Sequence, residues 1–279
     1  MKKCPYCGKE YPDEATNCAI DNELLLDNSP QLAAAEKQET KAAPKKNEPY
    51  LLFPDYKWSA RDAWKCVGVL FLFGFILFGV NQLIFSFFPN FWRSGFGYFS
   101  ESVLHYAVGL LIAAYFARTE TLATFWKGFN LDVKPSEYVW YGLVMALAIR
   151  ILGHFMIVQG WGHGVHDYDL AAFRNTIGFQ RYFFLLPLLI LAPICEEIIY
   201  RGFLYKAFRG SYPVAASMIL IVGWICYTHW SQYSVSWIAA LDLSTLTIVQ
   251  CYLREKSASL WDCILCHFAF NASLLFISR

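Results

Sequence analysis

Long apolar blocks, separated by short polar breaks, recur from Lys65 to the carboxyl end of the chain. A helix needs about 20 apolar residues to cross the hydrocarbon core of a bilayer, and most of these blocks approach that length. The pattern predicts an all-α, polytopic membrane helix bundle of about seven spans. These are Val67–Phe88, Ser102–Ala117, Tyr138–Val158, Tyr182–Tyr205, Val214–Trp230, Val235–Leu253 and Leu260–Ile277.

The composition divides the chain into two unlike parts. Hydrophobic residues make up 57% of it and charged residues only 16%, against about 25% charged in an average soluble chain. Residues 1–62 hold 20 of the 45 charged side chains. This excludes a single soluble domain, an intrinsically disordered chain and a disulfide-stapled secreted scaffold. The net charge of +1 gives no reason to expect nucleic acid as a partner.

The amino-terminal part carries ligands at zinc-ribbon spacing. Cys4-x2-Cys7 is followed by Gly8, and Cys18-x2-Asp21 forms a second pair in which a carboxylate replaces a cysteine. Both thiolates and carboxylates bind zinc, so a structural zinc site formed by these four residues is expected. The segment Cys4–Leu26 resembles the small zinc-ribbon modules at the start of many microbial membrane proteins. The alternative is a metal-free, disordered tail.

The charge-rich part is expected to have two segments. Residues 1–27 form the zinc-ribbon-like module, and residues 28–61 form a flexible linker and interfacial segment, because 28–49 are rich in Ala, Lys, Glu, Gln and Pro and lack aromatic residues. Residues 62–279 form the transmembrane helical domain.

Lysine and arginine are distributed unequally between the two ends of the predicted spans. With the amino terminus inside, the cytoplasmic side receives ten of them and the other side only Arg93, Arg174, Arg181 and Arg279. The positive-inside rule therefore predicts an integral multi-pass membrane protein with a cytoplasmic head. The ten are Lys57, Arg61, Lys65, Arg118, Lys127, Lys134, Lys206, Arg209, Arg254 and Lys256.

Ionisable residues within spans are costly, and each one indicates a functional site by default. The densest set is Glu196-Glu197-x-x-x-Arg201. Glu197 and Arg201 are four residues apart and share a helix face, so they are expected to pair. Glu196 is rotated by about 100° and remains for chemistry. Pro193, just before this set, is expected to free a backbone carbonyl and to kink the helix.

Two later spans supply possible partners for this carboxylate. His229 lies near the end of one span, and His267 and Asn271 lie four residues apart on one face of the last. Each residue alone is more typical of a helix–helix hydrogen bond. Together, a carboxylate, two histidines and an amide suit water activation and stabilisation of a developing oxyanion.

These residues resemble the motifs of the CAAX prenyl protease and bacteriocin-processing (CPBP, Abi) intramembrane peptidase family. The first motif, E-E-x-x-x-R, matches in full, and the third, H-x-x-x-N, matches at His267 and Asn271. The second, F-x-x-x-H, matches only at His229, because Ile225 replaces the phenylalanine. The resemblance covers residues 182–277, which would form the catalytic core.

The resemblance implies glutamate-dependent hydrolysis of a peptide bond within the membrane. Glu196 would be the general base and His229 would help to hold the water. His267 and Asn271 would stabilise the oxyanion, and Glu197 and Arg201 would support the site. A zinc site formed by Glu196, His229 and His267 is an alternative that the spacing does not decide.

The predicted span ends raise one difficulty. Counted at 1.5 Å per residue, Glu196 lies nearer the cytoplasmic side, whereas His229 falls nearer the opposite side. Either Lys206–Tyr212 lies along the interface and the following helix starts later, or that helix is tilted or broken. The motif interpretation requires all four groups to share one depth.

Other polar residues are expected to have smaller roles. The Trp161–Asp169 segment contains histidines and aspartates, but its composition is typical of a loop. Arg150 and His154, one turn apart within a span, are expected to pair with another helix or to line the cavity, and Asp242 is expected to act similarly.

The sequence therefore predicts an intramembrane endopeptidase with a cytoplasmic zinc-ribbon head. Its partners would be the lipid bilayer, a peptide or protein substrate, possibly prenylated or membrane-anchored, and a protein bound by the ribbon. Two other classes remain open. A non-catalytic scaffold of the same fold would use the ribbon as an adaptor, and a transporter would use the buried charges as a pathway.

Overall fold

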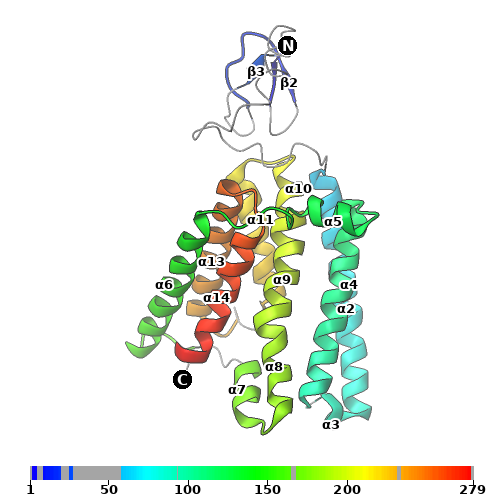
Figure 1. Ribbon diagram of the computed structural model, residues 1–279, viewed down its shortest axis with the longest axis vertical. Helices are drawn as coiled ribbons and strands as arrows, with labels where there is room; N and C mark the ends of the chain where they lie inside the picture. Colours follow the sequence, from blue (N-terminus) through cyan, green and yellow to red (C-terminus); the bar gives the residue numbers. More distant parts are fainter. Residues whose placement is uncertain are drawn as a thin grey trace.

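The structure is a computed structural model, and it describes residues 2–4, 9–19, 25–27, 58–92, 94–164, 168–230 and 234–277. The described part of the membrane body is helical (Figure 1). Its helices are α2 (Ala60–Phe87), α3 (Pro89–Trp92), α4 (Gly95–Ala117), α5 (Leu122–Gly128), α6 (Tyr138–Val158), α7 (Tyr168–Asn175), η1 (Phe179–Arg181), α8 (Tyr182–Leu186), η2 (Pro187–Leu191), α9 (Ala192–Glu197), η3 (Ile198–Leu204), α10 (Tyr205–Arg209), α11 (Val214–Thr228), α13 (Trp237–Lys256) and α14 (Trp261–Ile277).

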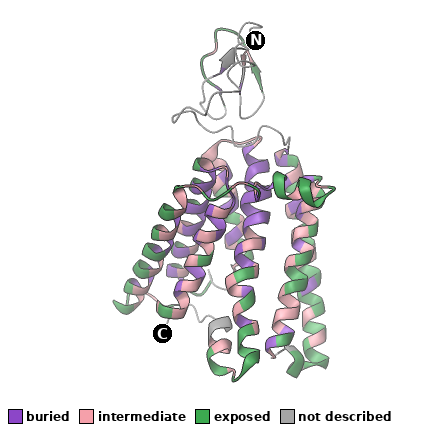
Figure 2. Cartoon of the chain, viewed as in Figure 1, coloured by how far each residue is buried: buried purple, intermediate pink, exposed green. Residues whose placement is uncertain are grey.

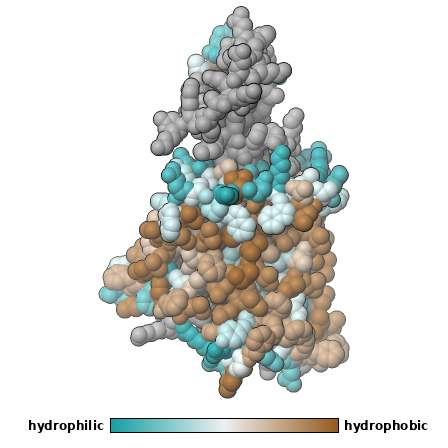
Figure 3. Space-filling view, viewed as in Figure 1, coloured by the Kyte–Doolittle hydropathy of each residue, from teal (hydrophilic) through white to brown (hydrophobic). Residues whose placement is uncertain are grey.

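All seven predicted spans coincide with helices, which confirms the all-α membrane bundle. Among the described residues, four helical stretches are long and apolar enough to cross a membrane: Ala60–Phe87, Gly95–Ala117, Tyr138–Val158 and the continuous run Phe179–Arg209. Helices α11 and α14 are apolar but shorter. Figure 3 shows the matching surface, with a broad hydrophobic band between more hydrophilic ends.

Two predicted spans begin earlier than the hydrophobic pattern indicated, because local caps start their helices. At α2 the backbone N–H and hydroxyl of Ser59 both donate to Asp62 Oδ2, at 3.0 and 2.8 Å, so the helix begins at Ala60 and not at Val67. At α4 the Ser94 hydroxyl accepts from the Gly97 N–H at 3.0 Å. The predicted span Ser102–Ala117 is therefore the end of a 23-residue helix.

The run Phe179–Arg209 is the central helix of the body. It packs against α4 on one side and α14 on the other, while α6, α13 and α14 pack together (Figure 1). All residues from Glu197 to Arg209 are buried, and Figure 2 shows this buried strip in the middle of the bundle. A helix that is buried on all sides belongs to the core, so this helix is the scaffold on which a site can be held rigidly.

Two π-helical segments interrupt the central helix, η2 (Pro187–Leu191) and η3 (Ile198–Leu204). In η2 the Ala192 N–H donates to the Pro187 carbonyl, five residues back. In that register the next donor would be the N–H of residue 193 to the carbonyl of Leu188, but Pro193 has no N–H. The Leu188 carbonyl is thereby released for a partner outside the helix.

One end of the bundle collects polar contacts between the helix ends. Arg209 Nε donates to Glu255 Oε1 at 2.8 Å, Lys206 Nζ donates to Asn130 Oδ1 at 3.2 Å, and Ser136 donates to Asp262. Three of the basic residues that were expected to flank the spans, Lys206, Arg209 and Arg254, are buried here. Their charges therefore stabilise internal contacts, whereas Arg61, Lys65, Arg118, Lys127, Lys134 and Lys256 are exposed.

The described part of the amino-terminal head is a small sheet. Strand β1 (Lys2–Lys3) pairs antiparallel with β2 (Glu10–Tyr11) and with β3 (Leu26–Asp27), in the order β2-β1-β3. The paired residues are Lys2 with Tyr11 and Asp27, and Lys3 with Glu10 and Leu26.

Candidate active site

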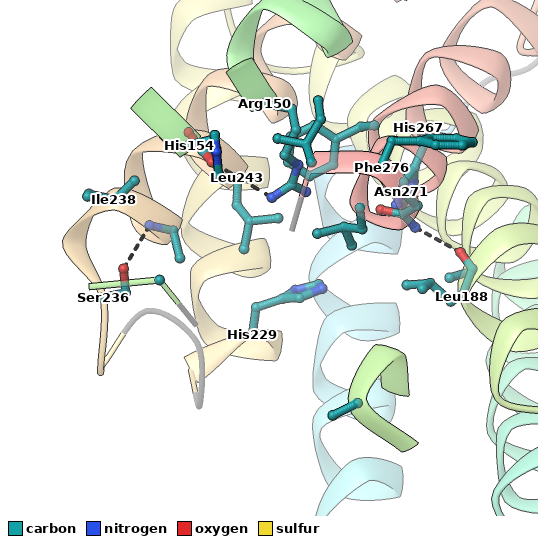
Figure 4. Close-up of a pocket in the computed structure, with 18 of the residues that line it drawn as sticks. Arg150, His154, Leu188, His229, Ser236, Ile238, Leu243, His267, Asn271 and Phe276 are labelled. Carbon is teal, nitrogen blue, oxygen red and sulfur yellow. Dashed lines mark hydrogen bonds and ion pairs between the residues drawn. The ribbon is translucent and has the colours of Figure 1, made fainter. Parts of the chain in front are cut away.

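A large cavity lies between the central helix and helices α4, α6, α11, α13 and α14. Its volume is about 1170 Å³, slightly above the range of roughly 300–1,000 Å³ that is usual for small-molecule pockets. Its walls include all four residues predicted to be catalytic, namely Glu196, His229, His267 and Asn271. Residues that are up to 75 positions apart in the sequence therefore line one space, in which His229, His267 and Asn271 can be followed in Figure 4.

Glu196 is the carboxylate on the cavity side of α9. It is only partly buried and lines the cavity. The hydroxyl of Tyr106, on α4, donates to Glu196 Oε1 at 3.1 Å, and Tyr106 lines the same cavity. None of the sequence motifs indicated Tyr106. Its polar hydroxyl within the predicted span Ser102–Ala117 could have indicated a functional residue, but no motif connects Tyr106 to Glu196, which lies 90 positions away.

Glu197 is the adjacent carboxylate, and it points into the core. Its side chain is fully buried, and Oε1 accepts hydrogen bonds from Arg201 Nη1 at 2.9 Å and from Gln250 Nε2 at 2.8 Å. His267 Nδ1 also lies 2.8 Å from this oxygen. The expected pairing of Glu197 with Arg201 is present, and Gln250 is a further partner that the motifs did not indicate. Glu197 therefore links η3, α13 and α14.

His267 and Asn271, both on α14, each have a hydrogen-bond partner on the central helix. Because a carboxylate oxygen can only accept, the contact with Glu197 occupies Nδ1 of His267 and leaves Nε2 as the nitrogen that can face the cavity. Asn271 Nδ2 donates at 2.9 Å to the Leu188 carbonyl, the group released by Pro193. The sequence predicted that Pro193 would free a carbonyl, and the structure identifies it and gives it Asn271 as its donor (Figure 4).

His229 caps the carboxyl end of α11, with φ −106° and ψ 26°. Its Nδ1 lies 3.2 Å from the Ile225 carbonyl and 3.1 Å from the Thr228 hydroxyl. A carbonyl only accepts, so the first contact favours a proton on Nδ1 and leaves Nε2 as an acceptor. Ile225, which replaces the motif phenylalanine, is 4% exposed and packs in the core.

The difficulty over depth is resolved by where the central helix ends. The predicted end at Tyr205 is wrong, because the helix continues through α10 to Arg209, and Lys206–Arg209 is buried helix and not an interfacial segment. Measured from the turn at Gly210–Pro213, Glu196 and His229 each lie about 20 Å along their helices. The two side chains therefore reach the same level of the bundle.

The cavity is also lined by three polar residues for which the sequence predicted only smaller roles. Arg150 and His154 from α6 and Asp242 from α13 all line it. Arg150 Nη1 lies 4.0 Å from Asp242 Oδ2. Their expected position beside a cavity is confirmed. In the Trp161–Asp169 segment, Gly164 lines the same space, and residues 165–167 lie outside the described part of the chain.

Two zinc sites were considered from the sequence, one in the head and one in the cavity. All three residues of the cavity set are described, but only two of the four in the head. Within the described ranges, no three His, Cys, Asp or Glu side chains are placed to hold a metal ion. In the head, Cys4 and Cys18 are buried against Leu25, and the Tyr11 hydroxyl lies 3.2 Å from Cys18 Sγ. The other two predicted zinc ligands, Cys7 and Asp21, lie outside the described residues.

Comparison with known proteins agrees with the motif assignment. Residues 178–273 match the family model described as type II CAAX prenyl endopeptidase Rce1-like. No curated protein and no solved structure matches the chain. The family match and the four apolar helices together make this an integral membrane protein. Residues 178–273 are therefore similar to the Rce1-like type II CAAX prenyl endopeptidases, a protease family, over the same part of the chain that carries the three motifs.

Proposed function

We propose that this protein is an intramembrane endopeptidase that hydrolyses a peptide bond of a membrane-associated substrate with Glu196 as the general base. The observation that carries the proposal is the shared cavity, lined by Glu196, His229, His267 and Asn271. A partly buried carboxylate that shares a cavity with two imidazoles and an amide has the groups needed to deprotonate water and to stabilise the resulting oxyanion. The family match at residues 178–273 supports a protease.

In the proposed reaction each residue has one task. Glu196 takes a proton from a water molecule, whose oxygen attacks the peptide carbonyl carbon. Nε2 of His229 accepts the second O–H of that water and so orients it. The carbonyl oxygen becomes an oxyanion and is stabilised by Asn271 and by His267, which donates from Nε2 in its doubly protonated form while Nδ1–H faces Glu197. Glu196 then returns the proton to the leaving amine as the carbon–nitrogen bond breaks.

The side-chain amide of Asn271 is preorganised to donate a hydrogen bond to the oxyanion. An amide nitrogen carries two N–H donors, and the Leu188 carbonyl accepts from Nδ2 at 2.9 Å, which fixes the plane of the amide. The second N–H is then directed without further loss of rotamer freedom. His267 is fixed in the same way through Nδ1 by Glu197. Preorganised donors of this kind are usually worth more to catalysis than flexible ones.

Hydrolysis of a fluorogenic peptide by the full chain in liposomes tests the proposal. We expect Glu196→Gln to lower kcat by about 10²–10⁴-fold, the range usual for loss of a general base. His267→Ala should also reduce kcat. Full activity in both variants would contradict the assigned chemistry. Adding a chelator to the Cys4→Ser variant, which lacks a ligand of the zinc site proposed below for the head, separates the two mechanisms, since only the zinc alternative predicts loss of activity.

We also propose that Cys4, Cys7, Cys18 and Asp21 bind a structural zinc ion in a cytoplasmic head. Cys4 and Cys18, one from each predicted pair, are buried in the same small cluster, where thiolates without a metal would be costly. Zinc content of the full chain should be about one equivalent and should fall in Cys4→Ser, with Cys66→Ser as a control. Equal zinc in both variants would exclude this site.

A further inference from the structure

Gln250 contributes a buried amide to the packing around Glu197. It lies on α13 and is 1% exposed. An amide in an apolar interior is costly unless it is hydrogen-bonded, and a polar residue within a bundle of apolar helices usually binds a neighbouring helix or a ligand. None of the three motifs includes Gln250, although it lies within residues 178–273. The groups that it binds therefore indicate its role.

The amide nitrogen of Gln250 faces acceptors on two other helices. Nε2 donates to Glu197 Oε1 at 2.8 Å and lies 3.4 Å from the carbonyl oxygen of Cys263 on α14. A carboxylate and a carbonyl can only accept, so the nitrogen and not the oxygen of the amide must lie at this point. In addition, Cys263 Sγ donates to the backbone carbonyl of Gln250 at 3.3 Å. Gln250 therefore connects α13 both to the central helix and to α14.

Three contacts from three helical elements meet at Glu197 Oε1. Arg201 Nη1 lies at 2.9 Å and His267 Nδ1 at 2.8 Å, in addition to the amide of Gln250. The ion pair with Arg201 lies within one helix, and the terminal torsion of a glutamate side chain is soft. That pair by itself would allow the carboxylate to rotate. Gln250, which belongs to a second helix, restricts the rotation and so fixes the position of Oε1.

The position of Oε1 matters because His267 depends on it. The contact between Oε1 and Nδ1 sets the plane of the imidazole ring, and with it the direction of Nε2, which is left for the cavity. Cys263 and His267 are four residues apart and share a face of α14. Gln250 therefore also holds the turn of α14 that precedes His267. It acts on the imidazole by both routes, while its own side chain is buried in the core.

We propose that Gln250 is a positioning residue for peptide hydrolysis: it holds Glu197 Oε1 in place and, through that oxygen, directs Nε2 of His267 at the oxyanion. The inference rests on the proposed function, in which His267 stabilises that oxyanion. Preorganised donors act on charge that develops only in the transition state. Loss of the positioning should therefore lower kcat and leave KM little changed.

The substitution Gln250→Met tests the proposal in the liposome assay, because methionine has a similar length and no N–H donor. We expect kcat to fall about tenfold, the lower end for one hydrogen bond to a charged group, since Arg201 still holds Glu197. Thr247→Val is the matched control, because it also removes a buried polar group from α13, one turn before Gln250. It should leave kcat unchanged. An unchanged kcat in Gln250→Met would overturn the inference.

Two background variants separate positioning from a general loss of packing. In the His267→Ala background, Gln250→Met should lower kcat by less than about twofold, because the residue through which Gln250 acts is gone. In the Asn271→Ala background it should still lower kcat about tenfold, because Asn271 is held by Leu188 and not by Glu197. An equal loss in the two backgrounds would mean that Gln250 only supports the fold, and would exclude the positioning role.

The remaining arms keep the result decisive. If Gln250→Met does not fold, Gln250→Asn takes its place in both backgrounds, because it keeps an amide but is one methylene too short to reach Glu197. The wild type and Glu196→Gln are measured alongside. Absence of cleavage by the wild type would contradict the proposed function itself. Cleavage by the wild type with equal kcat in Gln250→Met and Thr247→Val would contradict only the role of Gln250.

Discussion

Glu196 and Glu197 are neighbours in the sequence but belong to different environments. Glu196 faces the cavity and has Tyr106 as a hydrogen-bond donor. Glu197 is fully buried, and three side chains from three elements contact one of its oxygens. The rotation of about 100° per residue is sufficient to separate them. One carboxylate is accessible to a water molecule and the other stabilises the packing that presents it.

The largest expected effect concerns the buried member of the pair. Glu197→Gln should lower the free energy of unfolding by about 3–5 kcal/mol, because it leaves Arg201 as an uncompensated buried charge. Thermal or denaturant unfolding in detergent measures this. Glu196→Gln is the matched control and should cost far less stability, since its carboxylate lines the cavity. Equal losses in the two variants would show that the two sides of the helix do not differ as described.

The next effect concerns the cavity side. Asn271→Ala should lower kcat for the peptide by about 10²–10³-fold, the usual result of removing one oxyanion donor. Ser273→Ala is the control, because Ser273 is also buried on α14 but donates only to the Phe270 carbonyl of its own helix, at 2.6 Å. If Asn271→Ala instead reduced stability with kcat unchanged, the amide would only secure the Leu188 carbonyl.

A smaller effect is expected for Tyr106. Tyr106→Phe removes the hydroxyl that donates to Glu196, so kcat should fall by about tenfold, which corresponds to the lower end of the roughly 1.5–3 kcal/mol that a hydrogen bond to a charged group is worth. KM should change little. In the Glu196→Gln background the same substitution should have little further effect, and an independent loss there would argue against a role through Glu196.

Tyr205→Phe gives the smallest expected effect and completes the comparison. The Tyr205 hydroxyl donates to Glu255 Oε1 at 2.8 Å at the polar end of the bundle. The substitution therefore removes a tyrosine–glutamate hydrogen bond of the same kind, but away from the cavity. We expect a loss of about 1 kcal/mol in the free energy of unfolding and an unchanged kcat. A large fall in kcat here would mean that tyrosine–glutamate contacts affect the rate through stability alone.

Local patterns predicted much of this architecture. Hydrophobic runs located the helices of all seven predicted spans, because burial in lipid and burial in a helical core both require apolar side chains over the same lengths. Spacing predicted the Glu197–Arg201 pair, because both residues lie on one helix. Boundaries were predicted less well. The hydroxyl of Ser94 starts α4 within a stretch that looked like a polar break, and the buried residues Lys206 and Arg209 extend the central helix beyond its apolar part.

By itself, the sequence determined the seven long apolar segments, the family resemblance and the residues that carry the proposed chemistry, since these depend on composition and short spacings. Only the tertiary structure decided what each of those residues faces. The Tyr106–Glu196 contact spans 90 positions and the Asn271–Leu188 contact spans 83. Arg150 reaches the cavity because α6 packs against α13 and α14. Such contacts depend on the packing angle and register of whole helices, which many weak side-chain interactions set jointly and no short motif records.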